Sequence, residues 1–151
     1  MVRTKAVFTA HGSYTNALRI ADQQLHFAPD NVPRLVDKGG LCLLAGEFSN
    51  AIPPLTRALS LTNNYGGRIN RALAYVHLGR LDAAEADYQE ALRAFPTSNQ
   101  TYYGLAEVAL RKGETNAAIR YYQQYLSKAA TNSGEAKTVV ARLKELRPGA
   151  P

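Results

Sequence analysis

The sequence has no tryptophan, one methionine and one cysteine, and these absences limit what the chain can be. A lone cysteine, Cys42, excludes a disulfide framework within the chain. No apolar run approaches the roughly 20 residues that a membrane-spanning helix needs, so we expect no membrane insertion. The chain begins with a basic and then an apolar stretch. That apolar stretch is shorter than the about 7–15 residues of an export core, so we expect it to be helical.

Motifs that carry chemistry are also missing. The sequence contains no GxSxG nucleophile motif, no phosphate-binding loop and no HExxH metal motif. His11, His26 and His77 are isolated and show no zinc-ligand spacing, and we expect Cys42 to be a small core residue. We therefore predict a protein that is not an enzyme and that has no catalytic residues, no metal site and no cofactor.

A repeat of about 34 residues is the strongest feature of the sequence. Glycines mark it at intervals of 34, 33 and 34 residues: Gly12, Gly46, Gly79 and Gly113. An alanine follows each glycine by five residues: Ala17, Ala51, Ala84 and Ala118. Residues of helix N-cap type stand three places after each glycine: Thr15, Ser49, Asp82 and Asn116. Each unit therefore predicts a helix, a glycine turn and a second helix that starts near the N-cap type residue.

Apolar spacing sets the expected helix bounds. We predict the first helices of the pairs at 2–11, 32–45, 66–78 and 100–111. The second helices are predicted at 16–27, 50–61, 83–95 and 117–128. An amphipathic helix at about 134–146 follows the last pair. Neighbouring pairs must stack to cover their apolar faces, and a final helix must cover the last one.

This pattern resembles the tetratricopeptide repeat (TPR) family. The unit at 65–97 matches the family's succession of small and aromatic residues with Ala72, Tyr75, Gly79, Ala84, Tyr88, Ala91 and Pro96. The resemblance implies an all-α fold: an α-solenoid of antiparallel helix pairs, a right-handed superhelix, with a C-terminal capping helix. We expect a single array over residues 1–151, with repeats at about 1–31 (partial), 32–64, 65–98 and 99–131 and the capping helix at about 133–147.

The family geometry also implies a concave groove lined by the first helices. The implied peptide-binding positions are Val36, Asp37, Gly40, Leu43, Leu44, Ile69, Asn70, Leu73, Val76, His77, Gln100, Tyr103, Glu107, Leu110 and Arg111. Some family members hold a chaperone's C-terminal carboxylate with Lys, Asn and Arg at these places. Here Val36, Gly40, Gln100 and Gly104 occupy the corresponding positions and only Asn70 matches, which argues against that ligand.

These observations favour a non-enzymatic scaffold that binds a peptide or another protein in the groove. Three alternatives stay open. Another segment or a second copy of the chain could fill the groove, so self-association is one alternative. A nucleic-acid surface could form from Arg34, Lys38, Arg68 and Arg71, although no recognition motif accompanies them and this alternative is not favoured. The chain could also be the regulatory or substrate-guiding segment of a longer enzyme. We expect a cytoplasmic protein, or a periplasmic or exported one if an upstream signal sequence is missing.

Overall fold

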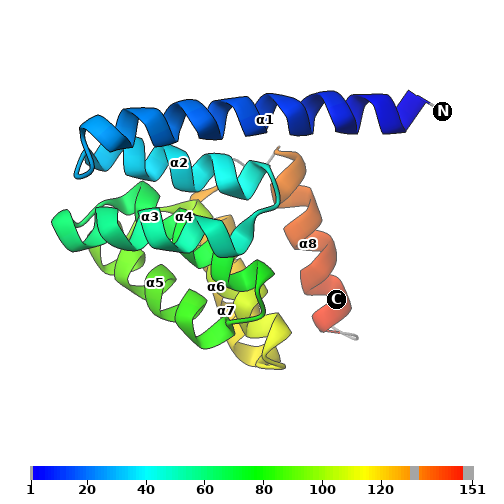
Figure 1. Cartoon of the computed structure of the whole chain (residues 1–151). Helices are drawn as coiled ribbons and strands as arrows, with labels where there is room; N and C mark the ends of the chain where they lie inside the picture. The colour runs from blue at the N-terminus through cyan, green and yellow to red at the C-terminus, as the bar shows by residue number, and fades with distance from the viewer. Residues whose placement is uncertain (1, 130–132, 148–151) are drawn as a thin grey trace. The chain divides into compact units, whose positions relative to one another are not determined.

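The computed structural model describes residues 2–129 and 133–147, and the side chains from Ser13 onward in these ranges. The described part of the chain is all-helical, as the repeat predicts (Figure 1). It contains eight helices and no strand, one helix fewer than the nine predicted. The chain divides into two compact units, residues 1–80 and 81–151. We refer to them as unit 1 and unit 2 and describe each by itself. The prediction that residues 1–151 form a single array stays a prediction.

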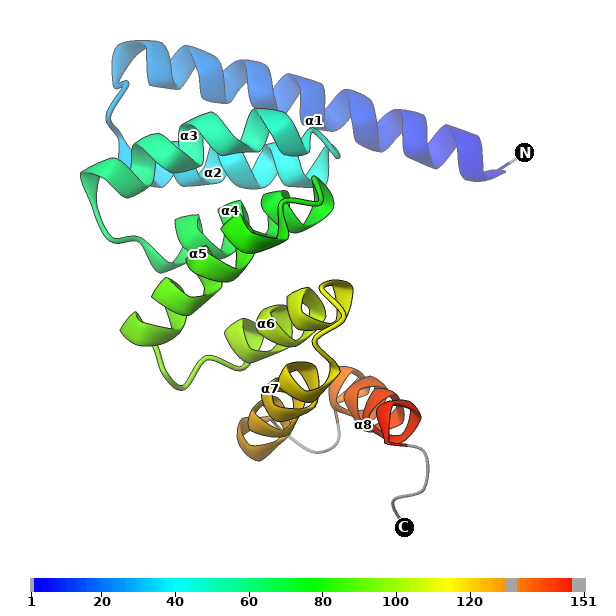
Figure 2. The same cartoon turned by 90° about the horizontal axis from the view of Figure 1, so that it is seen from below.

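Unit 1 contains α1 (Val2–Phe27), α2 (Val32–Leu44), α3 (Phe48–Leu61) and α4 (Tyr65–His77). The helices α2 and α3 form an antiparallel pair, α4 packs against both, and α1 lies along α2 (Figure 2). Cys42 is only 1% exposed and packs with Ala51, Leu55 and Ala74, which confirms its predicted place in the core. A Cβ atom on Gly39 would stand 2.4 Å from Cγ of Leu55, so glycine is required for this close packing.

Unit 2 contains α5 (Leu81–Ala94), α6 (Asn99–Arg111), α7 (Thr115–Lys128) and α8 (Gly134–Leu146). The helices α6 and α7 form a second antiparallel pair, with α5 against α6 and α8 against α7. The core between α6, α7 and α8 includes Ala106, Tyr122 and Val139, none of which is exposed. The bounds of α8 confirm the predicted final helix.

The turns after α2, α4 and α6 are built as the sequence predicts. Gly46, Gly79 and Gly113 have φ values of 76°, 71° and 78°, a region that favours glycine. The N–H of the next residue then donates back into the preceding helix: Glu47 to the Cys42 carbonyl and Glu114 to the Ala109 carbonyl, both at 2.8 Å. These backbone bonds reverse the chain within two residues.

The helices that follow these turns start earlier than predicted. They begin at Phe48, Leu81 and Thr115, so Ser49, Asp82 and Asn116 are the second helical residues rather than N-caps. The prediction was wrong because the backbone bonds of the turn, rather than a capping side chain, set the start. Side-chain capping occurs instead before α2, α4, α6 and α8, where the acceptors are Asn31, Asn64, Ser98 and Ser133.

The predicted helix break at Gly12 is also wrong. One helix, α1, runs without interruption from Val2 to Phe27 (Figure 1), so Thr15 lies inside a helix and is not an N-cap. A hairpin here would need small residues at its contact, whereas Lys5 and Gln24 stand at places that the repeat usually fills with small side chains. A continuous helix keeps all its backbone hydrogen bonds, and this outweighs the about 1 kcal/mol that an interior glycine costs.

Candidate functional site

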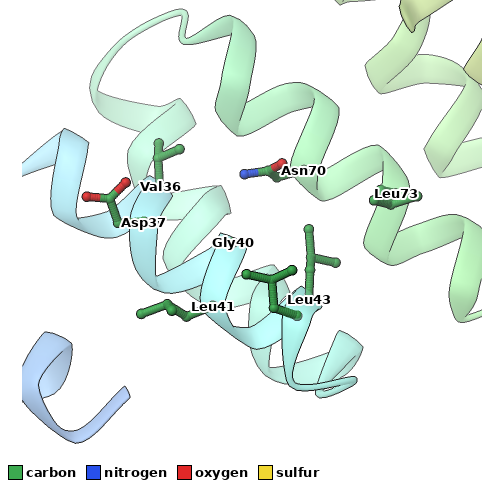
Figure 3. Close-up of a pocket in the computed structure, with 8 residues that line it drawn as sticks. Val36, Asp37, Gly40, Leu41, Leu43, Asn70 and Leu73 are labelled. Atoms are coloured by element: carbon green, nitrogen blue, oxygen red, sulfur yellow. The ribbon is translucent and has the colours of Figure 1, made fainter. Parts of the chain in front are cut away.

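An open recess of about 540 Å³ lies between α2 and α4 of unit 1. We call it the α2–α4 groove. Its lining consists of Val36, Asp37, Gly40, Leu41, Leu43, Leu44, Asn70 and Leu73 (Figure 3). All of these except Leu41 are among the predicted groove positions. Leu41 follows Asp37 by one helical turn and precedes Leu44 by three residues, so helical spacing alone could have added it.

The walls of the groove are apolar and partly open to solvent. Leu44 is 65% exposed and Leu73 is 38% exposed. Figure 3 shows the Asn70 side chain extending from α4 towards α2, with Leu73 farther along α4. Among the described residues, neither the Asn70 carboxamide nor the Asp37 carboxylate has a hydrogen bond or ion pair. The groove therefore combines apolar contact area with two polar groups that are free to bind a ligand.

The other predicted positions on α4 surround the groove without lining it. Ile69 and Val76 are buried at 4% and 7% exposure. Each lies close to a full helical turn from the core residue Ala72, so both share its inward face. His77 is exposed and its ring stacks on that of Phe48, with centroids 4.0 Å apart. The prediction thus assigned more positions of α4 to the groove than line the recess.

The predicted positions on α6 lie in unit 2, where α8 covers part of their face. Glu107 accepts hydrogen bonds from the Tyr122 hydroxyl and from Nη1 of Arg142, which belongs to α8. Nη1 of Arg142 also lies 3.0 Å from the Tyr122 hydroxyl oxygen. The ring of Tyr103 packs edge-on against Tyr122 and Tyr125, with centroids 6.1 Å and 5.8 Å apart.

The remaining α6 positions divide between core and surface. Leu110 packs against the core of unit 2, whereas Gln100 and Arg111 are exposed. Because these side chains and the α2–α4 groove lie in separate units, we describe them as separate surfaces. The spacing of residues in α6 could not have predicted that α8 covers part of this face, since that depends on where a later helix packs.

The shifted pKa values in unit 2 have structural causes. Burial, followed by the hydrogen bond to Glu107, raises the pKa of the Tyr122 hydroxyl well above its ordinary value. Burial also raises the pKa of Tyr103, and nearby Glu107 adds to the shift. A tyrosine with a raised pKa stays protonated at neutral pH and acts as a hydrogen-bond donor rather than a base. The described residues contain no group of three metal-ligating side chains.

The four side chains of the candidate basic patch all bind other groups within unit 1. Lys38 pairs with Asp22 at 2.5 Å, and Arg34 donates to the Gln24 carbonyl at 3.4 Å. Arg68 donates to the Asn63 side chain at 2.9 Å, and Arg71 donates to the Thr56 hydroxyl at 3.0 Å. These side chains already bind within the chain, which reduces what they can offer to phosphates. In the part of the chain that the structure describes, no helix has the length and apolar character to cross a bilayer.

Antiparallel helix pairs with glycine turns and fully buried alanines define an α-solenoid of helical repeats. Comparison with known proteins identifies the repeat. A profile of the tetratricopeptide repeat matches residues 69–134. The chain belongs to the tetratricopeptide repeat family. The family and the fold predicted from the sequence are thus confirmed.

Relatives known from sequence carry the same repeat in longer proteins. The inactive TPR repeat-containing thioredoxin TTL3 of Arabidopsis thaliana is 32% identical over 111 residues, which are 73% of this chain and 15% of that protein. Human DnaJ homolog subfamily C member 3 is 27% identical over 92 residues, which are 60% of this chain and 18% of that protein. The chain therefore spans less than a fifth of the length of either relative.

Solved structures agree on the fold. The crystal structure of the MamA protein superposes with a TM-score of 0.79 at 21% identity, over 95% of this chain and 81% of that chain. The first TPR of Spaghetti (RPAP3), solved with the HSP90 peptide SRMEEVD, superposes with a TM-score of 0.69 at 22% identity, over 76% of this chain and 89% of that chain. These likenesses show that the chain shares its fold with helical-repeat proteins.

Proposed function

We propose that this protein is a non-enzymatic scaffold that binds an extended peptide segment of a partner protein in the α2–α4 groove. The observation that carries the proposal is the composition of this groove. Leu44 and Leu73 leave apolar area open to solvent, and Asn70 and Asp37 add unpartnered polar groups. Apolar anchors supply contact area and a few polar groups fix orientation in sites of this kind.

The fold neighbour that holds a peptide supports the same use of the fold. The peptide in that structure, SRMEEVD, is acidic. In this chain the places where the family's cation clamp would stand hold Val36, Gly40, Gln100 and Gly104. We therefore propose a peptide other than a clamped acidic tail.

A selection experiment tests the proposal on the full chain. A phage library of random 12-residue peptides is selected against the wild-type protein and then screened against Leu73→Asp. The matched control is Leu61→Asp, because Leu61 is 41% exposed, close to the 38% of Leu73, and lies outside the groove. The proposal predicts peptides that lose binding to Leu73→Asp and keep it to Leu61→Asp. Peptides that bind both variants equally, or a failure to select any, would overturn it.

A further inference from the structure

We propose that α2 is the centre of a two-sided peptide site, in which apolar side chains enter recesses on both flanks of the helix and a lysine or arginine pairs with Asp37 between them. The inference rests on the proposed function and specifies the chemistry of the ligand. It goes beyond a groove between first helices, because it adds a second recess and a charge preference.

The second recess lies on the other flank of α2, against α1. It measures about 260 Å³ and is lined by Ala17, Ile20, Ala21 and Gln24 of α1 and by Arg34, Asp37 and Leu41 of α2. Asp37 and Leu41 line both recesses. Figure 3 agrees, because these two side chains leave α2 on the side away from Asn70 and Leu73. Asp37 and Leu41 therefore form a ridge between two neighbouring recesses.

Three of the five exposed large apolar side chains in the described part of unit 1 lie at these recesses, whereas Phe27 and Leu61 lie outside them. Ile20 is 47% exposed and lines the α1 side, while Leu44 and Leu73 line the α4 side. A helix with its side chains is about 10–12 Å across, and an extended chain covers about 3.3–3.6 Å per residue. Two apolar residues three to four positions apart could therefore reach both recesses, with the residue between them over Asp37.

Asp37 stands out among the acidic residues of unit 1. The unit has four carboxylates, and three of them bind within the chain: Asp22 to Lys38, Asp30 to Arg57 and Glu47 to Asn50. Among the described residues Asp37 alone of the four has no partner. The cations beside it on α2 are engaged elsewhere, Lys38 with Asp22 and Arg34 with the Gln24 carbonyl.

The overall charge of the protein does not override this local preference. The chain is basic, with a formal net charge of +6. Exposed charges farther apart than the Debye length, about 8 Å at physiological ionic strength, interact weakly. A ligand cation in contact with Asp37 therefore responds mainly to the charges of the ridge itself.

Gly40, which lines the α2–α4 groove beside the ridge, is a further sign that this face of α2 is built for a ligand. Packing requires Gly39, but a Cβ atom on Gly40 would meet only Nδ2 of Asn70, at the ordinary contact distance of 3.6 Å. A glycine inside a helix costs about 0.5–1 kcal/mol relative to alanine. Because glycine has no Cβ atom, the α2 backbone at Gly40 stays open beside the Asn70 carboxamide. A peptide main chain can approach closely at that place.

The selection described for the proposed function also tests this inference. Peptides that need Leu73 for binding are sequenced, resynthesised and measured against wild type and Asp37→Asn. We expect a lysine or arginine in these peptides, flanked by apolar residues three to four positions apart. Asp37→Asn should weaken binding by about two- to fivefold, as for a partly exposed ion pair. Asp37→Lys should prefer the same peptide with glutamate in place of its basic residue. Glu145→Gln, an exposed carboxylate on α8, is the charge control.

The outcomes separate the two proposals. Groove-dependent peptides that are not enriched in basic residues, or that bind Asp37→Asn and wild type equally, overturn the inference and leave the proposed function standing. A library with no groove-dependent peptides overturns both. Loss of binding in Ile20→Asp supports the α1 recess, and unchanged binding there contradicts it. A second copy of the chain as occupant would show as a dimer in sedimentation that Leu73→Asp dissolves, which would also overturn the inference.

Gly40→Ala gives an independent readout. The inference predicts a more stable protein that binds the selected peptide several-fold more weakly. The control is Gly134→Ala, because a Cβ atom at Gly134 of α8 meets nothing within 4 Å. Equal peptide affinity for Gly40→Ala and wild type would contradict the close approach of a ligand backbone at this position.

Discussion

The Glu107 side chain of α6 and the Arg142 side chain of α8 form an ion pair, and the same carboxylate accepts the hydroxyl hydrogen of Tyr122 from α7. Three helices thus meet at one carboxylate. Arg142 is the residue of α8 that reaches this network, so the pair contributes to the docking of the capping helix. Val139, three residues before Arg142 on α8, is fully buried.

Arg142→Ala is predicted to destabilise unit 2 by about 1–2 kcal/mol, because it leaves the half-buried Glu107 carboxylate without its cation. Urea unfolding measures this change. The control is Lys144→Ala, since Lys144 is exposed on the same helix. Equal effects of the two substitutions would show that the ion pair adds nothing to the docking of α8.

Tyr122 should make stability depend on alkaline pH. Its folded-state pKa is raised by burial and by Glu107, whereas in the unfolded chain it is about 10. The folded state therefore keeps this proton longer than the unfolded state, so the stabilisation is complete below about pH 10 and is lost as the pH rises further. Wild type should lose more unfolding free energy between pH 8 and pH 11 than Tyr122→Phe does. Parallel losses in the two proteins would contradict the assignment.

Gly39→Ala should destabilise unit 1 by more than about 2 kcal/mol, because the new Cβ would overlap Leu55 in the core. Its neighbour is the contrasting case, since Gly40→Ala introduces no clash. Thermal unfolding of the two variants compares them directly. Similar melting temperatures would mean that the core around Leu55 is looser than the structure shows.

Gly12 and Gly46 should respond to alanine in opposite directions. Gly46→Ala forces a side chain onto a φ of 76° and should cost about 1 kcal/mol. Gly12 lies inside the continuous helix α1, where alanine favours the helical conformation, so Gly12→Ala should be neutral or stabilising. Circular dichroism melting curves distinguish the two. If Gly12→Ala were instead destabilised, the result would favour the turn at Gly12 that the repeat spacing predicts over a continuous helix.

The comparison of these two glycines shows which turns could be predicted from the sequence. Spacing predicted the turns at Gly46, Gly79 and Gly113, because there the glycine and the buried alanine five residues later act together. At Gly12 the spacing is the same but the small contact residues are missing, so helix continuation wins. A glycine at the right interval therefore does not by itself produce the turn.

The candidate site also has parts that the sequence could predict and parts that it could not. Helical spacing from Val36 to Leu44 accounts for which α2 side chains share a face, whereas the resemblance to the repeat family implied that this face lines a groove. The role of Glu107 could not be predicted, because it depends on Arg142, which lies 35 residues away on a helix whose position the spacing of α6 does not encode. Contacts between distant helices decide which part of a predicted groove stays open.

The most direct test of the account is to map backbone amide shifts by NMR when a selected groove-dependent peptide is added to the full chain. The account predicts that the shifts concentrate on residues 36–44 of α2 and 70–73 of α4, with further shifts near Ile20 on α1. Shifts confined to α3, or to the α6 and α8 faces around Glu107, would contradict it.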